Sequence, residues 1–442
     1  MSLLEEVKQA GVIGAGGAGF PTHVKLAANA EYILLNGAEC EPLLRVDQQL
    51  MEVFADEIIQ GFVLAGRQVG AQQAIMGIKG KHRQVIQHMR ERIAALVQGN
   101  FVSVQELPDV YPAGDEQFLV HALTGRVVPE AGIPIQVGCV VVNSETALNI
   151  FHAAQGRPVT KKYLTLAGDI PNRMTLRVPV GTPILDVLRL SGIKDFSEYA
   201  VIDGGPMMGP VMKSLDGCIT KKNKGFVILK QKHSLICRKT VRPEQAQRIN
   251  RASCEQCRMC TDLCPRYLLG HNMQPHKMMR TVAYSLENTE EQKSAYLCCQ
   301  CNLCELFSCP AGLFPKSANL AVKQRLMEKN IRYQTELTEF LPRKLREHRL
   351  IPSKRLIARL GLHEFDQPAP MTQVTLHPAH YSFAMSQHVG APCSPTVTVG
   401  QHVQAGEQVG SVPEGNLGAP VHSSIAGTVV ACQNGAVIVR GD

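Results

Sequence analysis

Strand-like and helix-like patterns alternate over the first part of the chain. The β-rich apolar runs are Tyr32 to Leu35, Val102 to Val104 and Cys139 to Val142. Apolar residues recur with a helical period over Met51 to Gln68 and over Arg83 to Val97. Alternation of these two patterns is typical of α/β folds. We therefore predict an α/β domain over residues 1–155.

A strand-rich pattern punctuated by Gly and Pro follows over residues 160–235. Apolar runs begin at Tyr163, Thr175 and Val201, and one helical pattern covers Pro183 to Ser191. This predicts a small sheet crossed by a single helix. Helical patterns then dominate residues 245–345. Short strands that turn on Gly every few residues predict a compact all-β module over residues 370–442.

The composition is that of an ordinary globular protein. Of 442 residues, 45% are hydrophobic and 19% are charged, and no apolar run approaches the ~18 residues of a transmembrane helix. The amino terminus lacks the features of a secretory signal, so we expect a cytoplasmic protein without a membrane span.

The net charge of +8 is concentrated in residues 316–359, where Lys and Arg outnumber Glu. Apolar residues interleave with the basic ones, which predicts a solvated amphipathic helix; they are Leu326, Ile331, Leu337, Phe340, Leu341 and Leu345. An anionic partner is the alternative use of this segment. We expect no nucleic-acid binding.

Most of the 15 cysteines crowd into residues 254–309, a density that indicates metal ligation or redox chemistry rather than disulfides in a cytoplasmic chain. The first run is Cys254, Cys257, Cys260 and Cys264, followed by Pro265. Its spacing matches the bacterial 4Fe-4S ferredoxin run. The second run is Cys298, Cys301, Cys304 and Cys309, with one additional residue before the last cysteine. We predict two 4Fe-4S clusters, with a pair of zinc sites as the alternative.

The fourth cysteine of each run serves the other cluster in two-cluster ferredoxins. By that rule Cys264 joins the second run and Cys309 joins the first. Cys299 is a spare or substitute ligand.

A glycine-rich segment, Gly14 to Gly19, satisfies the G-x-G-x-x-G pattern, whose backbone NH groups cradle phosphate. A dinucleotide site of the usual kind needs a strand before the glycines and a helix after them. Here Leu3 to Ala10 has a helical pattern, and Phe20-Pro21 follows. The motif alone therefore does not predict a standard dinucleotide site.

Four ordered motifs resemble the NADH-binding flavoprotein subunit of respiratory complex I. The residues that carry the resemblance are Gly16, Gly17, Gly19, Phe20 and Lys25; Asn36, Glu39 and Glu41; Tyr111, Gly114, Asp115 and Glu116; and Asn143, Glu145 and Thr146. Asp115 stands where that family has the first of two Glu residues.

The resemblance implies a site for FMN, with NADH as co-substrate. It places Gly14, Gly16, Gly17 and Gly19 against FMN, Lys25 near the phosphate, and Asn36, Glu39 and Asn143 at the ribityl chain and ring. It also implies that Phe20 stacks on NADH and that Glu41 and Glu116 hydrogen-bond it. The other motif residues are assigned to the same cofactor site; they are Tyr111, Gly114, Asp115, Glu145 and Thr146. Flavin accepts a hydride and releases single electrons, which is the conversion that 4Fe-4S clusters need.

The other modules extend the resemblance. Asp203 to Pro210 resembles the signature of the soluble-ligand-binding β-grasp (SLBB) module of the same family. The tail is similar to the barrel-sandwich hybrid of biotinyl and lipoyl carriers. It has Val421 to Ala426 where those carriers have the modified Lys, so we expect no attached group.

The module order is similar to that of the cobalamin reductases of bacterial propanediol-utilisation microcompartments. This implies NADH-dependent reduction of cob(III)alamin to cob(II)alamin and cob(I)alamin, by the path NADH, FMN, first cluster, second cluster, cobalt. It also implies a microcompartment location, with a cobalamin adenosyltransferase and shell proteins as partners.

Two other functions stay open from the sequence. One is an electron-input subunit of a membrane NAD:ferredoxin oxidoreductase of the Rnf type, similar to RnfC. The other is a non-catalytic corrinoid-binding or shell-binding module. The sequence contains no Asp-x-His-x-x-Gly motif for a B12 ligand, and it indicates neither a corrinoid docking site nor an oligomeric state.

Overall fold

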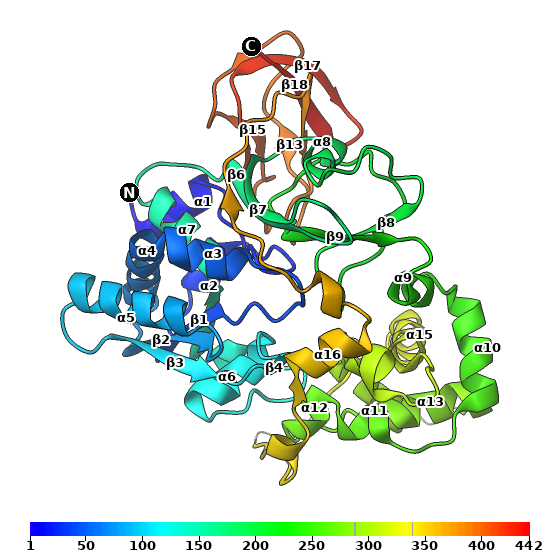
Figure 1. Ribbon diagram of the computed structural model, residues 1–442. Coiled ribbons are helices and arrows are strands. Elements are labelled where there is room, and N and C mark those ends of the chain that lie inside the picture. The colour runs from blue at the N-terminus through cyan, green and yellow to red at the C-terminus, as the bar shows by residue number, and fades with distance from the viewer. Residues whose placement is uncertain (287–288, 338) are drawn as a thin grey trace.

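The computed structural model describes residues 1–286, 289–337 and 339–442 (Figure 1). The first module has a parallel sheet in the order β3-β2-β1-β5. The strands are β1 Tyr32–Gly37, β2 Gln73–Lys79, β3 Val102–Leu107 and β5 Cys139–Asn143. Its helices are α1 Leu3–Gln9, α2 Thr22–Leu26, α3 Val46–Val53, α4 Ala55–Gln68, α5 Arg83–Leu96, α6 Glu116–Thr124 and α7 Ser144–Ala153, with a 3₁₀ turn at Pro134–Val137.

This sheet is buried on both faces, as the near-continuous apolar strands require. Ile33 and Leu35 face the core that includes α4 and α7, whereas Leu34 faces the core that includes α6. Helices α4 and α7 approach closely because Gly61 has no side chain: a Cβ there would lie 2.0 Å from the carbonyl oxygen of Ala147. The predicted α/β architecture is confirmed. The sequence pattern missed β2, α6 and α7.

The second module is a five-stranded mixed sheet in the order β11-β7-β6-β9-β8. Its elements are β6 Lys161–Gly168, β7 Met174–Pro179, α8 Ile184–Arg189, β8 Tyr199–Asp203, β9 Gly225–Lys230 and β11 Met371–Thr372. Strand β6 pairs antiparallel with β7 and parallel with β9. Helix α8 packs on this sheet through Ile184, Val187 and Leu188. The structure confirms the predicted small sheet with a single helix.

The cysteine-rich module is helical. It contains α9 Ser234–Lys239, α10 Pro243–Ser253, α11 Met259–Asp262, α12 Pro265–Leu268, α13 Pro275–Tyr284, α14 Thr289–Lys293, a 3₁₀ turn at Ser294–Leu297, a π-helical turn at Cys304–Ser308, and α15 Pro315–Glu328. Beyond it lie a 3₁₀ turn at Arg346–His348, α16 Ser353–Arg359 and a 3₁₀ turn at His363–Phe365. Strand β10 Ile351–Pro352 pairs with β4 Val110–Tyr111 of the first module.

The amphipathic helix predicted for the basic segment ends early. Helix α15 ends at Glu328, and the described residues from Ile331 to Pro342 form no helix. Asn330 adopts a left-handed backbone (φ 54°), and the amide of Ile331 bonds the carbonyl of Leu326, which is a helix-terminating arrangement. The apolar side chains of Leu337 and Leu341 are therefore exposed.

The C-terminal module has two antiparallel sheets, β12-β18-β17-β14 and β13-β15-β16, which pack around one apolar core. The strands are β12 Tyr381–Ala384, β13 Ser394–Pro395, β14 His402–Val403, β15 Gln408–Ser411, β16 Val421–His422, β17 Gly427–Gln433 and β18 Ala436–Gly441. Figure 1 shows this module at the top, against the sheet of β6 and β7. In the described part of the chain, no helix has the length and apolarity to span a bilayer.

Three modules meet at one buried lysine. Lys221 Nζ donates to the carbonyls of Gly11 and Pro420, at 2.8 Å each. Its backbone amide donates to Gln387 Oε1, at 2.9 Å. Nearby, the amide of Val389 donates to the carbonyl of Gly19, at 3.0 Å. The C-terminal module thus contacts the glycine-rich segment at Gly19, and Lys221 links it to Gly11 just before that segment.

Burial lowers the pKa of Lys221 from 10.5 to about 7. Because this lies below the value of the unfolded chain, the unfolded state binds more protons between these values, and the stability from Lys221 rises with pH there. Burial lowers the pKa of the facing His422 to about 3, so it does not titrate in this range. Burial raises the pKa of Cys393, which acts in the opposite direction but only near and above pH 9.

We expect Lys221→Met to lower the Tm and to weaken FMN retention, because two buried carbonyls lose their donor. The Tm difference from the wild type should widen between pH 7 and pH 9. Thermal unfolding across this pH range tests both expectations. Exposed Lys213→Met is the control, and an equal Tm loss in that variant would contradict the assigned role.

Candidate functional site

The candidate flavin residues gather where the sheet changes direction. From β1 the chain runs to β2 and β3 on one side, whereas β5 lies on the other side of β1. Asn36 at the end of β1 and Asn143 at the end of β5 are register partners. Ligands of open α/β sheets bind at the carboxyl ends of strands at such a switch point. The glycine-rich segment precedes β1 rather than following it, so it reaches this edge from outside the sheet.

One side of the glycine-rich loop is hydrogen-bonded to the rest of the protein, and the backbone at Gly17 faces free space. The amide of Ala15 donates to Thr146 Oγ1 at 3.0 Å, and the amide of Gly14 donates to the carbonyl of Phe20 at 2.9 Å. A Cβ on Gly17 would meet nothing within 4 Å, so the backbone there faces free space. A loop of bare backbone beside the switch point fits a flavin nucleotide.

A charged network lies beneath this loop. Lys224 of the second module contacts Asp47 Oδ2 at 2.5 Å and Glu39 Oε1 at 3.2 Å. Asn143 Nδ2 donates to Asp47 Oδ1 at 2.9 Å. Burial, and next the neighbouring Asp47, raise the pKa of Glu39, while the carboxylates raise that of Lys224. Asp47 and Lys224 were missed because they lie outside the motifs.

Several predicted residues are engaged by the protein itself. Glu145 forms a 2.5 Å ion pair with Lys162, and both side chains are only 1% exposed. Lys162 also donates to the carbonyl of Ala15, at 3.3 Å. Glu145 therefore supports the loop from behind rather than contacting a cofactor.

Glu41, which the resemblance assigns to NADH, is hydrogen-bonded within the protein. Its carboxylate accepts from the amides of Met207 and Met208, at 2.9 Å each. A Cβ on Gly205 would lie 2.1 Å from this carboxylate, so the glycine permits the contact. Glu41 thus joins the first module to the Gly/Met loop of the second.

The segment around Asp115 also contacts another module. Asp115 caps α6 by accepting from the amide of Phe118, at 3.1 Å, and it forms a bidentate pair with Arg266 at 2.5 and 2.8 Å. Asn36 Nδ2 donates to the carbonyl of Gly114, at 2.8 Å. This places Asp115 at the border with the cysteine-rich module.

Lys25 and Glu116 form the exposed rim of the site. Lys25 Nζ lies 3.0 Å from Glu116 Oε1 and also donates to the carbonyl of Val141, at 3.0 Å. Both side chains reach solvent, and Phe20, at the end of the glycine-rich loop, is half-buried. These are the predicted residues that stay accessible to a nucleotide.

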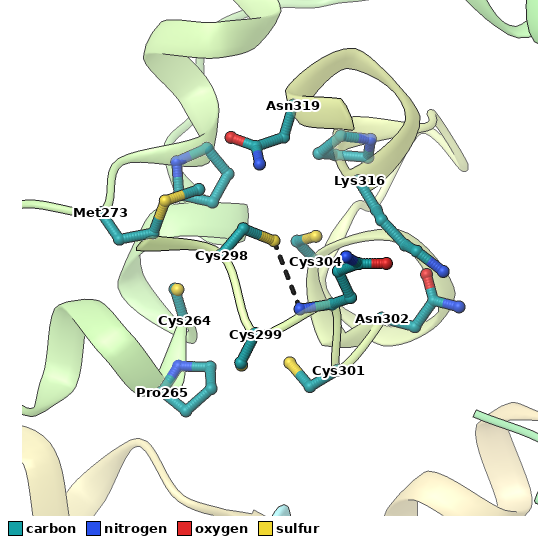
Figure 2. A pocket seen from close by; sticks show the side chains of 13 residues that line it. Cys264, Pro265, Met273, Cys298, Cys299, Cys301, Asn302, Cys304, Lys316 and Asn319 are labelled. Atoms are coloured by element: carbon teal, nitrogen blue, oxygen red, sulfur yellow. Dashed lines mark hydrogen bonds between the residues drawn. The ribbon is translucent and has the colours of Figure 1, made fainter. Parts of the chain in front are cut away.

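The second cysteine run and Cys264 line one cavity. Figure 2 shows Cys264, Cys298, Cys301 and Cys304 around it, with Cys299 beside them. The backbone amide of Gln300 donates to Cys298 Sγ, at 3.4 Å. The structure therefore brings Cys264 to the second run, as the ferredoxin rule predicts.

The first run gathers with Cys309. Burial, and next the thiols of Cys309, Cys254 and Cys257, raise the pKa of Cys260 to about 12. Burial similarly raises the pKa of Cys298 to about 11. Each of these two thiols is grouped with further cysteines, and the iron of a cluster would hold such sulfurs as thiolates. Both cysteine sets fit 4Fe-4S clusters.

The cavity of the second run lies against the flavin module. Tyr111 Oη donates to the carbonyl of Cys301, at 2.8 Å, and Arg266 follows Cys264 closely in the chain. Asn302 Nδ2 donates to the carbonyl of Met207, at 2.8 Å. The cavity of the second run therefore borders the flavin module, whereas the sequence placed the first run nearest to the flavin.

We expect Arg266→Met to lower the free energy of unfolding by about 3 kcal/mol, because it leaves the mostly buried carboxylate of Asp115 without its partner. A lower Tm in thermal unfolding measures this loss. The control is Arg90→Met, whose ion pair with Glu106 is about half exposed and should contribute less than about 1 kcal/mol. Equal Tm values for the two variants would contradict the structural importance of the Arg266 pair.

Family models match three parts of the chain. Residues 7–152 match the Nuo51 FMN-binding domain, residues 253–314 a 4Fe-4S dicluster domain, and residues 364–440 the RnfC barrel sandwich hybrid domain. The predicted FMN and 4Fe-4S cofactors are confirmed at this level. The zinc alternative is set aside by the dicluster match.

Curated relatives and solved structures are similar as well. The chain is 41% identical to the cobalamin reductase PduS of Citrobacter freundii, over 100% of this chain and 97% of that protein. It is 34% identical to one subunit of the Na(+)-translocating ferredoxin:NAD(+) oxidoreductase complex of Acetobacterium woodii, over 60% and 58% of the two chains. In fold, it is similar to an NAD+-reducing [NiFe]-hydrogenase structure, with a TM-score of 0.50, 20% identity, and coverage of 75% of this chain and 63% of that one.

Proposed function

Because this chain belongs to the family of the PduS cobalamin reductases, we propose that it reduces the cobalt of cobalamin with electrons from NADH. The substrate is cob(III)alamin, which is taken to cob(II)alamin and then to cob(I)alamin. FMN and two 4Fe-4S clusters, when bound, convert a two-electron hydride into single electrons.

The observation that carries the proposal is the hydrogen bond from Tyr111 to the Cys301 carbonyl. It joins the flavin edge of the sheet directly to a cavity lined by cluster ligands. This contact gives electrons taken from NADH a direct route from the flavin module to the cavity of the second cysteine run. The cysteines of the first run, with exposed Cys257, lie at the outer end of this arrangement.

The residues of the nucleotide site have distinct proposed tasks. Gly14, Gly16, Gly17 and Gly19 offer backbone to FMN, and Lys25 offers a positive charge to its phosphate. Asn36, Glu39 and Asn143 hold the ribityl chain and ring, with Lys224 balancing the charge of Glu39. Phe20 and Glu116 bind NADH at the open rim. Glu41, Tyr111, Gly114, Asp115, Glu145 and Thr146 position the loops.

The domain organisation is proposed from the same resemblance. Residues 1–155 form the FMN and NADH domain, 160–235 an SLBB β-grasp domain, 245–345 the two-cluster domain and 370–442 the barrel-sandwich hybrid. The sheet with β6 antiparallel to β7 and parallel to β9 supports the β-grasp assignment. The contacts of Lys221 and Val389 support a role for the hybrid as a brace of the flavin loop.

Partners and location follow from the chemistry of the product and from the family. Cob(I)alamin is a strong nucleophile, so we propose that a cobalamin adenosyltransferase alkylates it to regenerate coenzyme B12. The proposed location is the propanediol-utilisation microcompartment, with shell proteins as neighbours.

The test is anaerobic purification followed by measurement of iron, sulfide and flavin, then addition of NADH with hydroxocobalamin. We expect the corrinoid spectrum to change to that of cob(II)alamin, and an alkylating agent to trap cob(I)alamin. If NADH reduces flavin and clusters while cobalt stays unchanged, the proposal fails. That result would favour the second candidate, an electron-input subunit, which the RnfC-type module at residues 364–440 supports.

A further inference from the structure

The cavity of the second cysteine run holds one thiol more than a cluster uses. Cys264, Cys298, Cys299, Cys301 and Cys304 all line it (Figure 2). A 4Fe-4S cluster takes four thiolates, so one of these cysteines is left without an iron. The question is which one.

The loop of the first run has the same form but no additional cysteine. Left-handed residues flank its middle cysteine, Gln256 (φ 56°) and Arg258 (φ 68°). The second run repeats this with Gln300 (φ 58°) and Asn302 (φ 68°) on either side of Cys301. The two loops therefore share a backbone conformation, and Cys301 corresponds to Cys257.

From the first to the third cysteine the loops differ at three positions, and one of these differences adds a thiol. Where the second run has Cys299, the first run has Glu255, whose side chain bears no thiol. Cys299 instead lines the cavity together with Cys301, as Figure 2 shows. It also interacts with the thiol of Cys264 and the guanidinium of Arg266. Cys299 and Cys301 are thus adjacent thiols on one side of the cavity.

We propose that Cys299 and Cys301 are interchangeable ligands of the same iron, and that Cys264, Cys298 and Cys304 belong to both ligand sets. In the exchange the iron–sulfur bond of Cys301 breaks and that of Cys299 forms. The proton of the Cys299 thiol passes to the released thiolate of Cys301, and no electron moves. The proposal rests on the cluster in this cavity and not on the identity of the electron acceptor.

The exchange changes the surroundings of the cluster at its flavin side. Tyr111 donates to the carbonyl of Cys301, whereas Cys299 lies beside the positive charge of Arg266. Charge and hydrogen bonds around the sulfurs set the potential of a cluster. The two ligand sets therefore give two potentials at the point where electrons enter the cluster domain.

The test compares serine variants at the equivalent cysteines of the two loops, in the full chain purified anaerobically. We expect Cys257→Ser to lose about half of the iron and sulfide, because its loop has no substitute thiol. Cys301→Ser should keep the iron of both clusters. The double variant Cys299→Ser, Cys301→Ser should lose about half, as should Cys304→Ser.

Iron loss in Cys301→Ser equal to that in Cys304→Ser would overturn the proposal. Because a misfolded Cys301→Ser would also lose iron, a second measurement uses Cys299→Ser, which leaves the usual ferredoxin spacing intact. The EPR spectrum of the reduced wild type should contain two components for this cluster, and that of Cys299→Ser only one. Identical EPR spectra of the wild type and Cys299→Ser would overturn the proposal, whether or not Cys301→Ser folds. Neither measurement uses a corrinoid, so failure of the cobalamin proposal would leave this test unaffected.

Discussion

Replacing Cys257 with serine is expected to abolish corrinoid reduction while NADH still bleaches the flavin. Cys257 belongs to the cysteine set of Cys254, Cys260 and Cys309, whereas the flavin edge contacts the other set through Tyr111. Loss of the outer cluster interrupts the path after the flavin and not before it. Stopped-flow absorbance with NADH measures flavin reduction, and the same sample with hydroxocobalamin measures cobalt reduction.

The control for this variant is Cys237→Ser, which changes another exposed cysteine that lies outside both ligand sets. It should reduce the corrinoid at the wild-type rate. If Cys257→Ser retains corrinoid reduction, electrons leave from the cavity of the second run and the outer position of the first is wrong. If flavin bleaching is also lost while FMN content is normal, electrons do not pass from the flavin to the second run and then to the first.

The ligand sets could be predicted from the sequence because cluster chemistry acts through local spacing. Three cysteines separated by two residues each, followed by Cys-Pro, identify the ligands within a short stretch of sequence. Pairing of Cys264 with the second run followed from the same rule, and the structure has it. The relay order did not follow, because it depends on which cysteine set packs against Tyr111 and Asp115.

The supporting charges could not be predicted because they join distant segments. Lys224 meets Asp47 across 177 positions, and Arg266 meets Asp115 across 151. A lone Lys or Arg in a sequence has no pattern that identifies its partner. For the same reason the motif residues Glu41 and Glu145 were assigned to ligands, although the folded chain pairs them with its own amides and Lys162.

The basic segment after α15 shows a different limit. Its apolar spacing is helical, but Asn330 in a left-handed conformation ends the helix before the pattern does. Periodicity reports which residues would share a face if the helix continued. Periodicity does not reveal a single residue that ends the helix, because such a residue changes the free energy of helix formation by only about 1 kcal/mol.

Replacing Gly17 with valine is expected to eliminate FMN binding without unfolding the chain. A side chain at Gly17 would enter space that no protein atom within 4 Å occupies, so the apoprotein accepts it. The adjacent Gly16 lies against Asn143 at the switch point, since a Cβ there would be 3.1 Å from the Asn143 side chain, and the flavin is proposed to sit at this edge. Flavin content after purification and the affinity for added FMN, by quenching of its fluorescence, measure the effect.

The contrast with Gly61 separates lost binding from lost folding. A Cβ on Gly61 meets the carbonyl oxygen of Ala147 at 2.0 Å, so Gly61→Ala should lower the Tm strongly and lose FMN only as a consequence. Gly17→Val should instead keep the wild-type apoprotein Tm and both clusters, with FMN affinity reduced at least about a hundredfold, equivalent to about 2.7 kcal/mol. Full flavin content in Gly17→Val would remove the glycine-rich loop from the cofactor site, since bare backbone at that position would then serve no ligand.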